Sequence, residues 1–232
     1  MPPDPRADQK RAAARAAVAE MGEGMRIGLG TGSTAAFAIE ALGQRCRQGL
    51  RVEAVATSLA SEAAARAAGI VVIDFSRIDT IDIAIDGVDE IDGAFRAIKG
   101  AGGAMLREKI VATAARRMIA IADATKRVDR LGAARVPVEI LPFAEAFVSH
   151  AIRQNGGDPL LRIDRQGSAY RTDQGNAVLD CAFAEIADPA ALAAALAGIP
   201  GLFGHGLFLC EIDALYLGTD SGVVKSDRGR PE

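Results

Sequence analysis

Short apolar segments alternate with helical patterns through the first 131 residues of this chain. Met25–Gly30 is predicted as a strand, and a glycine-rich turn leads from it into an amphipathic helical pattern from about Ser33 to Cys46. The same alternation continues through residues 51–122, with Ile81–Ile85 as another apolar strand. Apolar strands separated by helices form a mostly parallel sheet that is covered on both faces. We therefore predict an α/β fold whose post-strand turns meet at one sheet edge, where such folds bind ligands.

The pattern changes near Leu131 and becomes strand, helix, strand, strand, helix, strand, ending around Phe203. This order is typical of a separate, small α+β lobe of ferredoxin-like kind. The segments 206–209 and 214–218 are expected to rejoin the first sheet. The tail from Ser226 onward is expected to be disordered.

Charge and composition exclude several function classes. The 27 basic and 30 acidic residues give a net charge of -3, so no basic surplus indicates nucleic acid binding and no polybasic block indicates membrane binding. No apolar run approaches the roughly 18 residues of a membrane span, and residues 1–8 contain charge and proline where a secretory peptide needs an apolar stretch. We therefore expect a cytoplasmic protein whose first residues are frayed.

The cysteines and histidines are few and far apart. Cys46, Cys181 and Cys210 lack Cys-x-x-Cys spacing, and His150 and His205 are equally isolated. Buried or incidental thiols are favoured over a zinc site, and His205, in a Gly-His-Gly turn, is assigned no role. We predict no metal.

The turn after the first strand indicates an anion site. Thr31, Gly32, Ser33 and Thr34 follow two glycines and open a helix, so backbone N–H groups and the positive helix end can bind a phosphate with help from three hydroxyls. An ordinary N-cap turn is the simpler alternative, but it does not explain three alternating glycines beside three hydroxyls. A Walker loop would need a lysine before Ser33, and the dinucleotide fingerprint needs a third glycine there.

Four acids crowd into the segment from Asp86 to Asp92. A calcium loop beginning at Asp86 would require glutamate at its twelfth position, which Ala97 occupies. Asp86 and Asp89 directly follow a buried strand, so we predict functional roles for both. Glu90 and Asp92 are interpreted as residues of a solvated turn.

A second glycine-rich turn leads into a helical pattern, with a lysine before the turn and a glutamate within the helical pattern. Lys99 precedes Gly100, Ala101 and Gly102, and Glu108 lies at the start of a helical pattern. A carboxylate and an ammonium that face one reactant can remove a carbon-bound proton and stabilise the resulting oxyanion. Lys126, just past another strand, is expected at the same sheet edge, although an exposed lysine alone has no specific meaning.

These motifs in this order resemble ribose-5-phosphate isomerases of type A. The resemblance rests on GLGTGSTA from Gly28, DGVDEIDG from Asp86, KGAGGAMLREKI from Lys99 and IADATK ending at Lys126, and it extends to VPVEILP from Val136. It implies a Rossmann-like domain built from residues 1–131 and 206–232, an inserted domain of residues 132–205, a homodimer, and no cofactor. It also implies interconversion of ribose 5-phosphate and ribulose 5-phosphate through an enediolate.

The resemblance also implies roles for individual residues. Glu108 would be the catalytic base, and the substrate-binding residues would be Thr31, Gly32, Ser33, Thr34, Asp86, Gly87, Val88, Asp89, Lys99, Gly100, Ala101, Gly102 and Lys126. Our hypothesis is that Glu108 moves the proton between C2 and C1 and that Lys99 stabilises the enediolate. Asp86 or Asp89 would transfer hydroxyl protons. Ala101 departs from the family pattern, since many relatives have an unbroken glycine triplet there.

Two alternative functions fit the sequence less well than the isomerase. A non-catalytic sugar-phosphate sensor would need a DNA-binding domain, and residues 1–24 before the first strand are too few for a winged helix-turn-helix. An amino-sugar-phosphate isomerase or deaminase would be expected to carry a pocket histidine. Neither His150 nor His205 lies in the loops described above.

Overall fold

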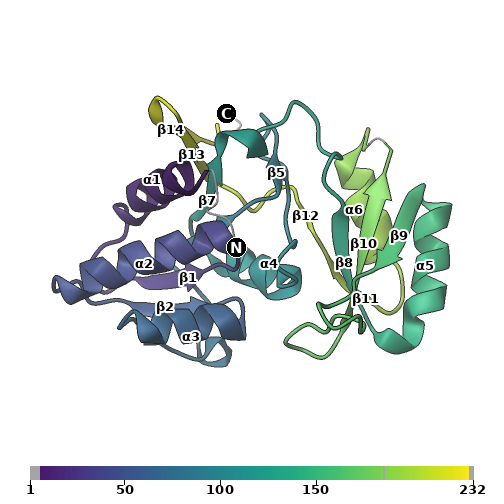
Figure 1. The fold of residues 1–232 in the computed structure, drawn as a ribbon, viewed down its shortest axis with the longest axis horizontal. Coiled ribbons are helices and arrows are strands. Elements are labelled where there is room, and N and C mark those ends of the chain that lie inside the picture. The colour runs from purple at the N-terminus through teal and green to yellow at the C-terminus, as the bar shows by residue number, and fades with distance from the viewer. Residues whose placement is uncertain (1–5, 185, 230–232) are drawn as a thin grey trace. The chain divides into compact units, whose positions relative to one another are not determined.

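The computed structural model describes residues 6–184 and 186–229 (Figure 1). By contacts between residues, the chain divides into two compact units. The first contains residues up to 88, 107–127 and those from 210 onward, and the second contains 89–106 and 128–209. The domain ranges expected from the sequence stay a prediction; in the division by contacts, residues 89–106 group with the second unit.

The first unit contains a seven-stranded sheet in the order β14-β13-β7-β4-β1-β2-β3. In that order the strands are Gly222–Asp227, Ala214–Thr219, Met118–Asp123, Ile83–Gly87, Arg26–Leu29, Glu53–Ala56 and Val71–Val72. All neighbouring pairs are parallel except β13 with β14. The predicted α/β fold with a mostly parallel sheet is confirmed.

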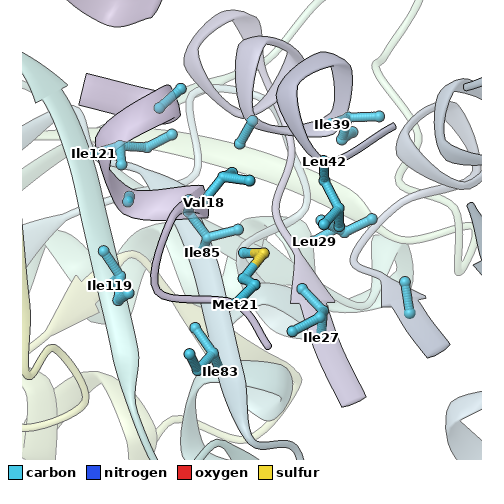
Figure 2. Packing of buried hydrophobic residues seen from close by; sticks show 14 of the residues in the cluster. Val18, Met21, Ile27, Leu29, Ile39, Leu42, Ile83, Ile85, Ile119 and Ile121 are labelled. Carbon is cyan, nitrogen blue, oxygen red and sulfur yellow. The ribbon is translucent and has the colours of Figure 1, made fainter. Parts of the chain in front are cut away.

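Helices cover both faces of this sheet. The helices are α1 (Ala7–Val18), α2 (Ser33–Arg47), α3 (Leu59–Ala67) and α4 (Met105–Ala114), with the short η1 (Phe75–Arg77) and η2 (Ala124–Lys126). Figure 2 shows Val18 and Leu42 gathered with strand residues such as Ile27 and Ile85 in one buried cluster. Gly28 lies between Ile27 and Leu29 of this cluster on β1. A Cβ at Gly28 would lie 2.5 Å from a methyl group of Val111 in α4. Because successive strand residues point to opposite faces, α4 lies on the other side of the sheet.

The second unit contains a four-stranded antiparallel sheet in the order β11-β8-β10-β9. Its elements are β8 (Val136–Ile140), η3 (Pro142–Ala144), α5 (Glu145–Gln154), β9 (Gly157–Leu161), β10 (Ala177–Phe183), α6 (Pro189–Ala197) and β11 (Leu202–His205). This chain order and strand order are those of a ferredoxin-like βαββαβ domain. Val138, Leu179, Val148 and Leu196 share one buried cluster, so both helices pack on the same face of the sheet.

Two details of the expected fold are wrong. The first half of the returning segment does not rejoin the first sheet: β12 (Leu207–Phe208) pairs antiparallel with β6 (Ala97–Ile98), which pairs with β5 (Glu90–Ile91). Ser226 and Asp227, expected in a disordered tail, belong to β14 and pair with β13. Residues 1–5, part of the expected frayed start, lie outside the described residues. Among the helices of the described chain, none is long and apolar enough to cross a membrane.

An ion network joins elements of the first unit. Glu20 accepts hydrogen bonds from Arg117 and Tyr216 and pairs with Lys225, while Arg117 also bonds Asp227. Burial alone would raise the pKa of Glu20, but the bonds from Arg117, Lys225 and Tyr216 outweigh it and lower the pKa to about 2.

Glu20→Gln should therefore lower the free energy of unfolding at pH 7. A carboxylate whose folded pKa is depressed stabilises the fold above its ordinary pKa, and this contribution is lost as the pH falls from about 4.5 toward 2. Urea unfolding of wild type and variant at pH 7 and pH 3 should show a smaller difference at pH 3, with exposed Glu40→Gln as the control. A difference that grows on acidification would contradict the assignment.

Candidate active site

In the first unit, the turns after β1 and β4 are joined through one carboxylate. Oδ1 of Asp86 accepts hydrogen bonds from the backbone N–H of Thr31 at 3.1 Å and of Gly87 at 2.7 Å. A Cβ at Gly30 would lie 1.9 Å from Cγ and Oδ1 of Asp86, so only glycine allows this approach. Asp86 itself is buried. The structure thus brings together the turn predicted to bind phosphate and the first of the two predicted aspartates.

The hydroxyl of Thr31 lies in a cluster with hydroxyls from the start of α3. Its Oγ1 is 2.7 Å from Oγ1 of Thr57, 2.8 Å from Oγ of Ser58 and 3.1 Å from Oγ of Ser61. Ser61 donates in turn to the carbonyl of Gly30 at 2.7 Å. This cluster fixes Thr31 from the side of α3. It was not predicted from the sequence, because it depends on how the turns after two adjacent strands meet.

The N-terminus of α2 presents its first amides without a side-chain cap. Gly32 has φ 106°, a conformation that L side chains rarely adopt, and it turns the chain into the helix. Ser33 is exposed and Thr34 is buried. From α1, Nζ of Lys10 donates to Oγ of Ser33 at 3.2 Å. Helix amides, a hydroxyl and an ammonium are groups that could hold a phosphate dianion.

Lys10 was not predicted from the sequence. Its position in an Ala-rich helical stretch carries no signal by itself. Its role depends on the packing of α1 beside α2, which brings residue 10 to residue 33.

The predicted base, Glu108, lies in the first turn of α4 and is 3% exposed. Acids are stabilised in this turn by the positive end of the helix dipole. Its neighbour Lys109 has a pKa lowered to about 8 because burial disfavours the charged ammonium, although Glu211 and Cys210 oppose that effect.

Lys126 ends η2, directly after β7. Asp123 caps this short helix by accepting from the N–H of Thr125 at 3.0 Å. Since β7 pairs with β4 in parallel, the turns after these two strands lie at the same sheet edge, as predicted.

Val88, which is buried, is in the first unit, and the other predicted residues, from Asp89 to Gly102, lie in the second unit. Asp89 accepts a hydrogen bond from the backbone N–H of Ala101 at 3.0 Å, which links the acidic segment to the lysine loop. Lys99 is 2% exposed, with Nζ 5.3 Å from the centre of the Phe208 ring. The N–H of Lys99 donates to the carbonyl oxygen of Gly206 at 2.8 Å, and a Cβ at Gly206 would lie 2.1 Å from the carbonyl oxygen of Lys99.

The other two acids have partners of their own within the second unit. Glu90 is buried and accepts from the N–H groups of Gly132 and Ala134. Asp92 is also buried and accepts from the N–H of Ala94 and from Arg96. The prediction that both lie in a solvated turn is therefore wrong: Glu90 is buried because it joins two distant segments, and Asp92 because it accepts the hydrogen bonds of its own turn. In the described part of the chain, no group of three or more His, Cys, Asp or Glu residues could hold a metal ion.

The chain is similar to known proteins over nearly its whole length. A family model of ribose 5-phosphate isomerase A, also called phosphoriboisomerase A, matches residues 53–222. A ribose-5-phosphate isomerase A of Sphingopyxis alaskensis is 47% identical over 95% of this chain and 96% of its own. One from Methanosarcina acetivorans is 47% identical over 94% and 93%.

Solved structures of isomerases with the same family name are also similar to this chain. A ribose 5-phosphate isomerase A from Methanocaldococcus jannaschii has a TM-score of 0.92 at 35% identity, covering 96% of this chain and 99% of its own. A D-ribose-5-phosphate isomerase in complex with phospho-erythronic acid also has a TM-score of 0.92, at 34% identity, covering 95% and 98%.

Gly30→Ala should destabilise the first unit, because the new methyl group would overlap the Asp86 carboxyl. Overpacking of this kind costs about 1–3 kcal/mol, which corresponds to a fall of about 2–12 °C in the unfolding midpoint of a chain this size. Thermal unfolding followed by circular dichroism measures it. Gly93→Ala is the matched control, since a Cβ there meets no heavy atom within 4 Å. Equal midpoints for the two variants would show that Asp86 does not lie against Gly30.

Proposed function

The chain belongs to the ribose 5-phosphate isomerase A family, and we propose from this premise that it interconverts D-ribose 5-phosphate and D-ribulose 5-phosphate. The observation that carries the proposal is the 47% identity to a named isomerase over 95% of the chain. The reaction moves a carbonyl between C1 and C2, so a proton must leave C2 and return at C1. It belongs to sugar-phosphate metabolism in the pentose phosphate pathway.

Glu108 is proposed as the residue that carries this proton. One carboxylate can serve both carbons, because C1 and C2 are adjacent in the enediolate. Burial in the first turn of α4 supports the role, since it limits the positions open to the side chain and shields it from bulk water. A positioned general base contributes about 10²- to 10⁴-fold to the rate.

Lys99, Asp86 and Asp89 are proposed as the other catalytic residues. The Lys99 ammonium would stabilise the negative charge that develops on the enediolate oxygen, an effect of about 10²- to 10³-fold for one preorganised group. Asp86 or Asp89 would move hydroxyl protons during ring opening and between O1 and O2. No step of this proposed mechanism uses a metal or an organic cofactor.

The phosphate is proposed to bind at the N-terminus of α2. The amides from Thr31 to Thr34, the hydroxyl of Ser33 and the ammonium groups of Lys10 and Lys126 are the supporting features. The remaining substrate contacts are proposed for Gly87, Val88 and the backbone from Gly100 to Gly102. With an overall charge of -3, the protein needs such a local positive site for an anionic substrate.

Glu108→Gln should lose turnover by about 10²- to 10⁴-fold while it keeps substrate affinity, because the amide preserves shape but cannot accept the proton. Formation of ribulose 5-phosphate from ribose 5-phosphate gives turnover, and calorimetric titration with phospho-erythronic acid gives affinity. Exposed Glu40→Gln is the control. Near-normal turnover in Glu108→Gln would reject this base; a wild-type protein that binds but forms no product would reject the isomerase and favour a sugar-phosphate sensor.

We further propose that the protein is a cytoplasmic homodimer. In the second unit, Phe143 in η3 is 95% exposed, and Phe147 in the following helix α5 is 56% exposed. The N–H of Leu141 bonds the carbonyl of Gly201, which ties the segment before Phe143 to the start of the edge strand β11, where Phe203 is also exposed. An exposed apolar group beside an edge strand is a typical surface for pairing with a second copy.

Phe143→Glu should therefore shift the protein from dimer to monomer, since it places a charge in an apolar interface. Light scattering after size exclusion should give twice the chain mass for wild type and for exposed Val224→Ser on β14, and a lower mass for Phe143→Glu. A wild-type monomer at micromolar concentration would reject the dimer.

A further inference from the structure

The backbone turn after Lys99 has a charged partner that the proposed mechanism does not use. Arg162 follows β9 in the second unit, about sixty residues along the chain. Its Nη1 donates to the carbonyl oxygen of Gly100 at 3.2 Å and to that of Ala101 at 3.0 Å, and Nη2 also reaches Gly100 at 3.3 Å. Two consecutive peptide carbonyls are therefore directed at one guanidinium.

A residue of the four-stranded sheet holds the Arg162 guanidinium in place. Asp180 on β10 accepts from Nε of Arg162 at 2.8 Å and from Nη2, which is a bidentate pair. The Tyr170 ring lies beside the guanidinium, with Cζ 5.6 Å from the ring centre. The Tyr170 hydroxyl donates to the carbonyl of Gly102 at 3.4 Å, and burial raises its pKa, so the proton stays on it. A planar, five-donor guanidinium can bond a carboxylate and two carbonyls at once, which a lysine ammonium cannot reproduce.

This arrangement sets the direction of the amides as well as of the carbonyls. In a trans peptide the N–H points opposite to the C=O of the same plane. Because the Gly100 carbonyl points to Arg162, the N–H of Ala101 points away from it, and there it bonds the carboxylate of predicted catalytic residue Asp89. The Ala101 carbonyl also points to Arg162, so the N–H of Gly102 is turned away as well. Among the described residues no partner accepts from that Gly102 N–H.

We propose that Arg162, oriented by Asp180, is a positioning residue for catalysis: it orients the 100–102 backbone so that one amide fixes Asp89 and the next donates to an oxygen of the reacting substrate. Arg162 does not itself touch the substrate. The proposal rests on the isomerase function proposed above, and it adds a residue that acts through Gly102 and Asp89. An N–H oriented in advance stabilises charge that develops in the transition state more than it stabilises bound substrate.

Steady-state kinetics of Arg162→Lys test the proposal. A shift of about 1 Å in a reacting group costs up to about 10²-fold, so we expect kcat to fall about 10- to 100-fold with KM changed by less than about threefold. The inhibition constant of phospho-erythronic acid, whose carboxylate resembles the enediolate, should rise in proportion to the loss of kcat/KM. Exposed Arg153→Lys on α5 is the matched control and should match wild type.

Two further variants keep the test valid if Arg162→Lys does not fold. Asp180→Asn should show the same kinetic pattern, because the guanidinium loses its ionic partner. Tyr170→Phe should show a smaller loss, because it removes one long hydrogen bond. A kcat within twofold of wild type in Arg162→Lys, or a fall in kcat that leaves the inhibition constant unchanged, would overturn the positioning role. Both outcomes require an active wild type, whereas an inactive wild type would reject the isomerase itself.

Discussion

The contact between the Asp86 carboxylate and the backbone of Gly30 is the constraint on which the rest of the first unit's site depends. Two parallel neighbours, β1 and β4, end at one edge, and the carboxylate spans their turns by accepting from Thr31 and from Gly87. The turn at Thr31 therefore cannot move without moving Asp86. Because the same turn starts α2, the position of the helix amides is tied to the position of the aspartate. The proposed phosphate site and the proposed catalytic aspartate are therefore coupled by geometry.

Much of this arrangement follows from local sequence signals. Apolar periodicity predicts β1, β4, β7, α2 and α4, and parallel pairing then brings the turns after the strands to one edge, as observed. The sequence did not predict β5 and β6, each of two residues, which is too short for any period to show, and it assigned the segment of β12 to the wrong sheet. On β14, four of six residues are exposed, so its polar pattern resembles a tail. Pairing with β13 makes it a strand, and pairing is not a local property.

The site residues that sequence reasoning missed share a different cause. Lys10 matters because α1 packs beside α2, and Arg162 because a strand of the second unit faces the turn at Gly100. Neither residue lies in a motif, and each is separated from its partner by more than twenty residues. The sequence motifs contain the residues for which we propose chemical roles. Residues that orient those motifs are visible only in three dimensions, since a lone lysine or arginine in a sequence is usually a solvated side chain.

The glycines of these loops act through close packing rather than through flexibility. At Gly30 and Gly206 an added Cβ would overlap the carboxyl of Asp86 and the carbonyl of Lys99, and at Gly103 it would lie 2.4 Å from the Tyr170 hydroxyl. Gly100 requires glycine for its φ of 105°. Ala101 is exposed and has no left-handed conformation, since Phe95 is the one described non-glycine residue with positive φ. The departure from the glycine triplet therefore falls at the position where a methyl group meets neither steric nor conformational cost. Alanine at this position lowers the conformational entropy of the unfolded chain, so the folded loop that follows Lys99 is stabilised.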